Sequence, residues 1–134
     1  MAKRKARPPA ARRSGCPIAG TLDLLGDKWT LLVVRDLMFY GKSRFNELQA
    51  SPESVPTNIL ADRLRRLEEG GLVRKARYQT NPSRYEYLLT PKGAELIPVL
   101  REMISWGKRY LADIGPPPPG GFLRPGQASE EKGP

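Results

Sequence analysis

The spacing of apolar residues changes from a helical to an alternating period in the middle of this chain of 134 residues. From Val55 to Glu69, three leucines recur four and three positions apart, which places them on one face of a helix. The opposite face carries hydrogen-bonding side chains, which this helix can present to a groove. After the helix, apolar and polar residues alternate, which predicts strands at 72–77 and 84–89 joined by a polar turn at 78–83.

A shorter helix precedes that one. Phe45 and Leu48 are three positions apart in a helical pattern that Ser43 can cap. A polar link follows, after which Ser54 is the expected N-cap of the longer helix, with Pro56 in its first turn. Two helices joined by a short turn and followed by a hairpin predict a winged helix-turn-helix, a mainly α fold with a small β wing. The second helix of such a pair enters the major groove of DNA.

Two further helices are expected before this unit, as a platform for it. Ile18–Leu25 has apolar residues at helical spacing. Gly26-Asp27 then interrupts the chain and caps a helix from Trp29 to Tyr40. The positions of this helix expected to be buried are Leu32, Val33, Leu37 and Met38.

The last predicted helix carries more apolar surface than its own domain needs. Thr90-Pro91 supplies a capping hydroxyl followed by proline, and the helical pattern runs to about Leu111. Apolar residues repeat along it at seven-residue intervals, so a contact with a second copy of the chain is the simplest explanation. Packing within the domain is the alternative. Pro98 lies inside this predicted helix and is expected to kink it or to remove one of its hydrogen bonds.

The net charge of +9 is unevenly distributed. Residues 1–13 hold six basic residues and no acidic one, and residues 42–84 hold nine basic and five acidic residues. Positive charge therefore gathers on the helix-turn-helix and the hairpin, as expected for a polyanionic partner such as double-stranded DNA. A solvated basic surface is the alternative.

We expect a basic disordered tail over 1–14, a folded domain over 15–112 and a Pro/Gly-rich disordered tail over 113–134.

The missing residue types exclude several kinds of chemistry. With no histidine and a single cysteine, the chain offers no imidazole base, no intramolecular disulfide and no cysteine-cluster metal site. No combination of residues indicates an enzyme, a cofactor or a metal. No apolar run reaches the roughly 18–20 residues of a membrane span, so we expect a cytoplasmic protein with no membrane partner.

Short motifs along residues 16–111 together resemble those of one known family. They are Cys16-Pro17, Leu25-Gly26-Asp27-Lys28-Trp29-Thr30, Gly41-Lys42-Ser43-Arg44-Phe45-Asn46-Glu47-Leu48, Asn58-Ile59-Leu60, Gly71-Leu72-Val73 and Pro98-Val99-Leu100 with Trp106-Gly107. In this order and spacing they are similar to the HxlR family of bacterial winged-helix transcription regulators, which is related to the MarR type. The wing departs from the family pattern, because Ser83 and Arg84 follow Pro82 where the family usually has a Pro-Pro pair.

The resemblance implies a homodimer that binds a pseudo-palindromic operator with one winged helix-turn-helix per subunit. The first and last helices would form the dimer interface. The residues expected there are Ile18, Leu22, Leu96, Leu100, Met103, Ile104, Trp106 and Tyr110.

DNA contacts are expected from the longer helix, its neighbour and the wing. Thr57, Asn58 and Arg65 are expected to face the major groove, since asparagine and arginine suit bidentate contacts to base edges. Asp62 either accepts a hydrogen bond from a cytosine amine or merely repels the DNA backbone. Arg63 lies nearer the buried side, where it braces the fold or reaches a phosphate. The phosphate candidates outside this helix are Lys42, Arg44, Arg77 and Arg84. For Arg77 and Arg84, which bracket the wing tip, a minor-groove contact is the other possibility. For each single side chain, a solvated charge is the alternative.

Cys16 stands directly before the first helix, where a helix N-terminus stabilises the reactive thiolate. In some HxlR-family members the cysteine at this position senses oxidants or electrophiles. The resemblance therefore makes Cys16 a candidate redox sensor, with an oxidant or another small molecule as the effector. A small buried residue at the edge of the dimer is the alternative.

Three functions are compatible with these patterns. The leading hypothesis is a sequence-specific DNA-binding transcriptional regulator. A nonspecific nucleoid-type DNA-binding protein would show a steep salt dependence and little preference among sequences. A winged-helix protein-interaction module would bind a protein partner and negligible DNA.

Overall fold

The apolar stripes of the sequence meet in one core in the computed structural model, which describes residues 12–111 and 113. The elements follow one another in the order that the sequence predicts, except near the C-terminal end. In chain order they are α1 (Pro17–Leu25), α2 (Thr30–Phe39), α3 (Phe45–Gln49), α4 (Thr57–Glu69), β1 (Val73–Thr80), β2 (Ser83–Leu89), α5 (Pro91–Ala94) and α6 (Ile97–Tyr110).

The core lies between α2, α4 and the base of the two strands. The three leucines of the α4 stripe are buried, as their spacing predicts, and each contributes about 1.5–3 kcal/mol through burial. Val33 and Met38 of α2 are buried against them, whereas Leu32 and Leu37 are only partly covered. Helix α4 is therefore held by one narrow stripe, and its opposite face is left to solvent.

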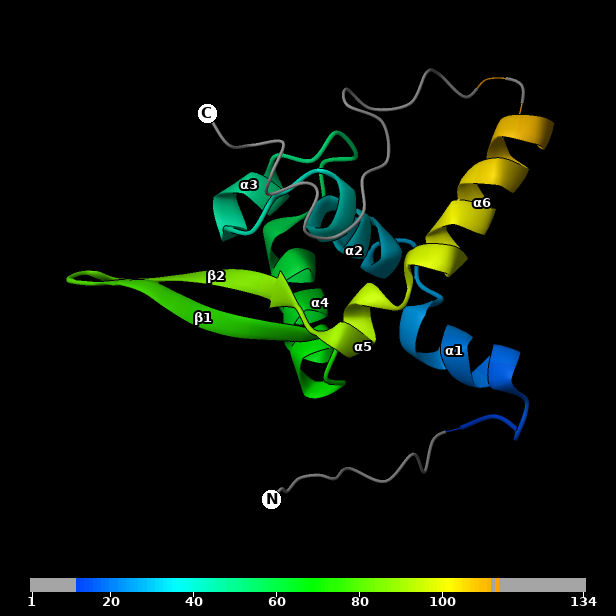
Figure 1. The fold of residues 1–134 in the computed structure, drawn as a ribbon, viewed down its shortest axis with the longest axis horizontal. Helices are drawn as coiled ribbons and strands as arrows, with labels where there is room; N and C mark the ends of the chain where they lie inside the picture. The colour runs from blue at the N-terminus through cyan, green and yellow to red at the C-terminus, as the bar shows by residue number, and fades with distance from the viewer. Residues whose placement is uncertain (1–11, 112, 114–134) are drawn as a thin grey trace.

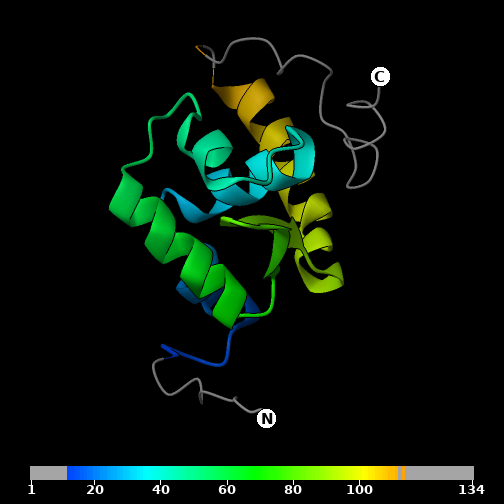
Figure 2. The same ribbon diagram turned by 90° about the vertical axis from the view of Figure 1, so that its left-hand side faces the viewer.

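The strands and the terminal helices project from opposite sides of this core. β1 and β2 pair in an antiparallel two-stranded wing that extends away from the body, while α1 and α6 lie at the other end (Figure 1). Seen from the wing side, the wing points toward the viewer and α4 lies beside it (Figure 2). The predicted fold, a mainly α winged helix-turn-helix with a small β wing, is thus confirmed.

Helix α4 begins later than the sequence suggested. It starts at Thr57, and its N-cap is Pro56 in an extended conformation with φ −61° and ψ 146°. The prediction that Ser54 is the N-cap is wrong, because this residue has a φ of 60°, in the left-handed region. The chain turns at Ser54 and buries Val55 in the core before the helix starts.

Helix α3 is also capped differently from the prediction. The Glu47 carboxylate accepts hydrogen bonds from the backbone N–H groups of Ser43 and Arg44, at 2.9 and 3.0 Å. A carboxylate at this position satisfies N–H groups that the helix leaves free. Ser43 does not act as the cap; its hydroxyl donates to Glu86 Oε1 in the wing, at 3.2 Å.

The wing is longer than the strands that alternation predicted. Pairing continues to Thr80 opposite Ser83, so the turn is only Asn81-Pro82, joined by a cis peptide bond. The polar turn predicted at 78–83 is therefore wrong. The register shifts between Arg77 and Gln79, which makes Tyr78 the extra residue of a β-bulge. Backbone pairing needs no apolar side chains, so alternation gave no signal for this outer part.

The single long helix predicted from Pro91 to Leu111 is in fact two. Thr90 Oγ1 accepts from the backbone N–H of Gly93 at 3.1 Å and caps the short helix α5, as expected from its sequence. A separate helix, α6, then begins at Ile97. Pro98 lies in the first turn of α6, where its missing N–H costs nothing, so the expected kink is wrong.

The predicted tails lie almost entirely outside the described residues. Of the basic tail expected over 1–14, residues 12–14 are described, and Arg13 Nε lies 2.6 Å from Asp23 Oδ1 of α1. The tail expected over 113–134 is described only at residue 113, and the domain limits at 15 and 112 stay a prediction. Within the described part of the chain, no helix is long and apolar enough to cross a membrane.

Candidate nucleic-acid interface

The first turn of α4 presents two polar side chains to solvent. Thr57 and Asn58 are both exposed, as predicted for residues that face a groove. Thr57 Oγ1 accepts a hydrogen bond of 2.6 Å from Gln49 Nε2, which belongs to α3. This contact joins the two helices of the helix-turn-helix at their solvent side.

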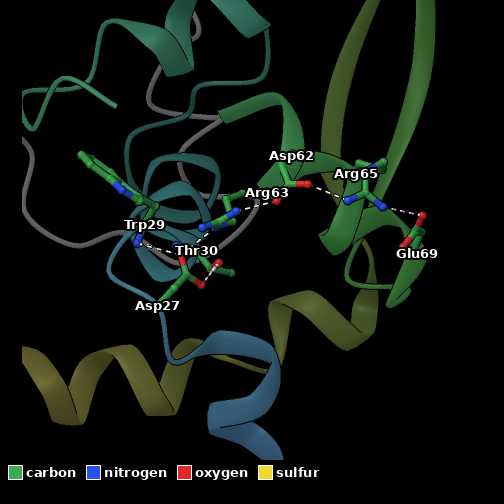
Figure 3. A network of polar contacts seen from close by, with 7 residues as sticks. All are labelled: Asp27, Trp29, Thr30, Asp62, Arg63, Arg65 and Glu69. Atoms are coloured by element: carbon green, nitrogen blue, oxygen red, sulfur yellow. Dashed lines mark hydrogen bonds and ion pairs between the residues drawn. The ribbon is translucent and has the colours of Figure 1, made fainter. Parts of the chain in front are cut away.

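A row of alternating charges continues along the exposed face of α4 (Figure 3). Arg65 lies between two carboxylates, at 2.6 Å from Asp62 Oδ1 and 2.9 Å from Glu69 Oε2. Hydrogen bonds from Arg65 and Arg63 lower the pKa of Asp62, so it is ionised at neutral pH. The guanidinium of Arg65 is therefore held against the helix by two acids.

Arg63 is placed beneath this face and not on it. Its side chain is only 16% exposed, and its guanidinium lies 2.8 Å from Asp27 Oδ2 and 2.5 Å from Asp62 Oδ2. Of the two roles that the sequence left open, bracing the fold is the one this geometry supports. Arg63 connects the recognition face of α4 to the corner between α1 and α2 (Figure 3).

Asp27, the partner of Arg63 in that connection, is itself held by several hydrogen bonds. Its carboxylate accepts from the backbone N–H groups of Trp29 and Thr30, at 3.0 and 3.2 Å, and from the Thr30 hydroxyl, so it caps α2 as predicted. Burial alone would raise the pKa of Asp27, but these hydrogen bonds and the one from Arg63 hold it well below its ordinary value. The sequence indicated the cap and missed the ion pair, because Arg63 is 36 positions away.

The two phosphate candidates beside α3 contact aromatic rings. Lys42 is half-buried, with its Nζ 5.8 Å from the ring centroid of Tyr40. Arg44 is exposed, and its guanidinium lies 4.3 Å from the ring centroid of Tyr78 in the wing. Both residues belong to the segment that leads into α3, and the Arg44 guanidinium contacts the wing through Tyr78.

The wing holds the densest positive charge of the interface. Arg77 and Arg84 are exposed near its outer end, opposite Tyr85 and Gln79 respectively. The sequence analysis did not select Lys75, whose Nζ lies 4.7 Å from the ring centroid of Tyr85. The wing contains four basic residues and one acidic residue, whereas α4 contains three of each. Attraction to a polyanion therefore comes from the wing more than from α4.

A partly buried ion cluster before α4 was also missed. Arg35 of α2 makes two hydrogen bonds to the Glu53 carboxylate, at 2.7 and 2.8 Å, and two to Asp36 Oδ1. Asp36 is 2% exposed; burial raises its pKa, and Arg35 opposes that rise. Because Glu53 lies in the turn between α3 and α4, this cluster fixes the path into the recognition helix. Arg35 and Glu53 are 18 positions apart, so no local pattern signals the contact.

The terminal helices expose an apolar surface far from the wing. Ile18 is 71% and Trp106 60% exposed, and Leu22, Met103 and Tyr110 are exposed as well. Leu100 is only 6% exposed, because it packs into the core of its own subunit. The remaining predicted interface residues, Leu96 and Ile104, are partly buried against that core.

Cys16 is exposed at the N-cap of α1, and its backbone N–H donates to Ser14 Oγ at 3.2 Å. Its own subunit does not bury the thiol, and the alternative of a residue buried at the edge of a dimer stays a prediction. Among the described residues, no cluster of three or more His, Cys, Asp or Glu side chains could hold a metal ion.

Comparison with known proteins identifies the family of this fold. A family model described as an HxlR-like helix-turn-helix matches residues 24–114, which is more than half of the chain. The chain belongs to the HxlR-like helix-turn-helix family. The resemblance drawn from the sequence motifs is thereby confirmed.

Known relatives and solved structures are similar to most of this chain. An uncharacterised HTH-type transcriptional regulator of Mycobacterium tuberculosis is 37% identical over 107 residues, which are 80% of this chain and 66% of the relative. The chain thus spans just under two thirds of that relative's length. The redox regulator HypR in its oxidised form is 38% identical, with a TM-score of 0.61, over 70% of this chain and 96% of that one. The reduced form of the transcriptional regulator YodB from Bacillus subtilis is 32% identical, with a TM-score of 0.61, over 72% and 95%.

Proposed function

We propose that the protein is a homodimeric, sequence-specific DNA-binding transcriptional regulator. The observation that carries this proposal is that α4, which has exposed polar residues, lies beside the basic wing (Figures 1 and 2). The names of its relatives, HTH-type transcriptional regulators, support it.

The two parts of the interface have different tasks in this proposal. The wing, with three more basic than acidic residues, supplies attraction to phosphates, which depends on salt and not on sequence. Helix α4 has no net charge, so it contributes little to nonspecific attraction. Its exposed side chains, Asn58 and Arg65 above all, read base edges in the major groove, and Asp62 accepts from a cytosine amine.

Dimerisation through α1 and α6 completes the proposal. An exposed face with Ile18, Met103 and Trp106 is costly in water, and aromatic and methionine side chains are enriched in the cores of protein interfaces. This face lies opposite the wing, so a partner subunit seated there leaves both wings free (Figure 1). Two recognition helices would then meet two half-sites of a pseudo-palindromic operator.

A selection followed by a titration tests the proposal. Duplexes enriched by the full-length protein from a random library are compared with scrambled duplexes by fluorescence anisotropy at about 150 mM salt. We expect affinity for the selected duplex to be about 10³-fold or more higher than for the scrambled one. Asn58→Ala should reduce this ratio, since one good bidentate contact supplies about 1–3 kcal/mol of discrimination.

The same titration separates the competing functions. Equal, weak binding to both duplexes that falls steeply with salt would replace the proposal with a nonspecific nucleoid-type protein. Absence of binding to either duplex would favour a protein-interaction module, to be pursued by affinity purification.

We also infer that the regulator responds to oxidants through Cys16. The thiol is exposed at a helix N-terminus, and two similar structures are a redox regulator in its oxidised form and a diamide-treated regulator. With one cysteine per subunit, oxidation would join two subunits by a disulfide: two thiols lose two electrons and two protons, and diamide takes them up.

Cys16→Ser tests this inference, because the chain has no other cysteine. In the wild type, we expect diamide to give a covalent dimer on non-reducing gels and to change operator affinity at least several-fold. The variant should show neither effect while binding DNA normally. An equal response of both proteins to diamide would rule out a role for Cys16.

A further inference from the structure

The wing is held to the body by contacts beyond its own base. The backbone N–H of Tyr87 donates to the Ser43 carbonyl at 2.7 Å, and the Ser43 hydroxyl donates to Glu86 at 3.2 Å. Both contacts lie in the inner half of β2. Farther out, the guanidinium of Arg44, the residue directly before α3, lies over the Tyr78 ring, 4.3 Å from its centroid.

Tyr78 is well placed to control the direction of the wing. It is the extra residue of the bulge in β1, and a bulge bends and twists a two-stranded ribbon. Everything beyond it, including Arg84 and the turn at Asn81-Pro82, follows the direction set at that point. A ribbon of two strands is only marginally stable by itself, so an outside contact at the bend has a large influence on its position.

Arg44 is itself fixed at its backbone. It is the N-cap of α3, and its N–H donates to Glu47 Oε1 at 3.0 Å. The adjacent Ser43 makes the inner contacts to the wing. The segment that starts α3 thus contacts the wing at two levels, with backbone and hydroxyl groups near the base and with a stacked guanidinium at the bulge.

We propose that Arg44 and Tyr78 are positioning residues that fix the angle of the wing relative to α4. The effect of this contact on DNA rests on the proposed DNA-binding function. The angle of the wing decides whether Arg77 and Arg84 reach phosphates while α4 is in the groove. Arg44 then acts on DNA through the wing, in addition to any phosphate contact of its own. A stacked arginine retains free N–H groups, so the two roles are compatible.

The first test is made on the free protein. Amide hydrogen exchange of residues 74–86 is measured in Arg44→Ala, Tyr78→Ala and the double variant. Loss of a cation–π contact at an exposed site should speed exchange about two- to fivefold in each single variant. The double variant should be no faster than the faster single one, because both changes remove the same contact. Tyr78→Phe keeps the ring and should retain wild-type exchange.

The second test uses the selected operator. Arg44→Ala and Tyr78→Ala should each lower affinity several-fold, with a combined effect clearly smaller than the product of the two. Arg74→Ala, which removes an exposed charge at the inner end of β1, should lower affinity without speeding exchange in the wing.

The outcomes separate the two proposals. If Arg44→Ala weakens DNA binding but leaves exchange in the wing unchanged, Arg44 is a phosphate contact only and the positioning role is overturned. If exchange rises as expected but the wild-type protein binds no DNA, the contact still positions the wing, and it is the proposed function that fails.

Discussion

At the scale of single residues, Asp27 has the most consequential position in the described structure. One carboxylate caps α2 and also binds Arg63 of α4, so it joins the platform to the recognition helix. Arg63 in turn holds Asp62, which holds Arg65 (Figure 3). The orientation of Arg65, an exposed side chain of α4, is thus tied to a partly buried acid between α1 and α2.

Removing the charge of Asp27 should destabilise the protein in a pH-dependent way. Asp27→Ala should cost about 1–2 kcal/mol at neutral pH through loss of the cap, and Asp27→Asn somewhat less. Since the folded-state pKa of Asp27 is depressed below its ordinary 3.8, its stabilisation is complete above that value and is lost as the pH falls below it. Urea denaturation between pH 2.5 and 7 should therefore show the wild type converging on Asp27→Asn in acid.

The matched control is Asp23→Asn. Asp23 makes a surface ion pair with Arg13, which is worth less than about 1 kcal/mol. A constant difference between the wild type and Asp27→Asn across the whole pH range would contradict the assigned role of the carboxylate.

At the scale of elements, α5 sets where the wing ends and α6 begins. Thr90 Oγ1 caps α5 and also donates to the Gly71 carbonyl at 2.6 Å, so the exit of β2 is fastened to the entry of β1. Gly93 lies so close to this point that a Cβ on it would be 2.2 Å from the Leu72 carbonyl oxygen. Neither atom can move without shifting the base of the wing.

Gly93→Ala should therefore destabilise the protein despite the higher helix propensity of alanine. We expect a loss of about 1–3 kcal/mol, as for overpacked sites, measured by thermal or urea denaturation. Gly107→Ala in α6 is the control, because the nearest atom to its Cβ, Leu111 Cδ1, is at an ordinary 3.7 Å. That variant should be neutral or more stable by up to about 1 kcal/mol. Equal stabilities for the two variants would show that the base of the wing adapts.

At the scale of the whole molecule, the fold separates two surfaces. The polar and basic one, formed by α4 and the wing, lies on one side, and the apolar one, formed by α1 and α6, lies on the other (Figure 1). The core between them includes residues of both α4 and α6. Substitutions on the two surfaces should consequently affect different properties.

The apolar surface should govern association. Trp106→Glu is expected to raise the dimer dissociation constant at least tenfold without unfolding the subunit, since large exposed aromatic residues are common interface hot spots. Leu100→Ala should instead cost about 2–5 kcal/mol of folding stability, because its side chain fills the core. Sedimentation velocity and urea denaturation separate these effects.

Ser105→Glu, an exposed substitution away from the apolar row, controls for the added charge. A Trp106→Glu protein that dimerises like the wild type would contradict this interface.

The basic surface should govern salt dependence. In a dimer, Arg77→Ala with Arg84→Ala removes up to four phosphate contacts, so the slope of log K against log salt should flatten by about 3–4. Asn58→Ala should leave this slope unchanged while reducing discrimination between selected and scrambled duplexes. Anisotropy titrations at several salt concentrations measure both quantities. Suppose that the double variant of Arg77 and Arg84 no longer discriminates between the duplexes but keeps the wild-type salt slope. The wing, and not α4, would then read the DNA sequence.

The sequence by itself determined the fold class and most of its elements. The spacing of Leu60, Leu64 and Leu67 fixes which face of α4 is buried, and alternation after Gly71 marks the inner wing, since both follow from local backbone geometry. The clustering of basic residues and the motif order were enough to indicate a winged helix-turn-helix of the HxlR type, which the family match confirms.

Tertiary structure alone decided which side chains are bound to distant residues and which apolar side chains are buried. The contacts Asp27–Arg63, Arg35–Glu53 and Arg44–Tyr78 join residues 36, 18 and 34 positions apart, and no periodicity encodes such pairs. The same holds for the apolar residues of α6, which share one helical pattern although Leu100 is core and Trp106 is surface. Local sequence sets the direction in which a side chain leaves its helix, but only the packing of distant segments determines what it meets there.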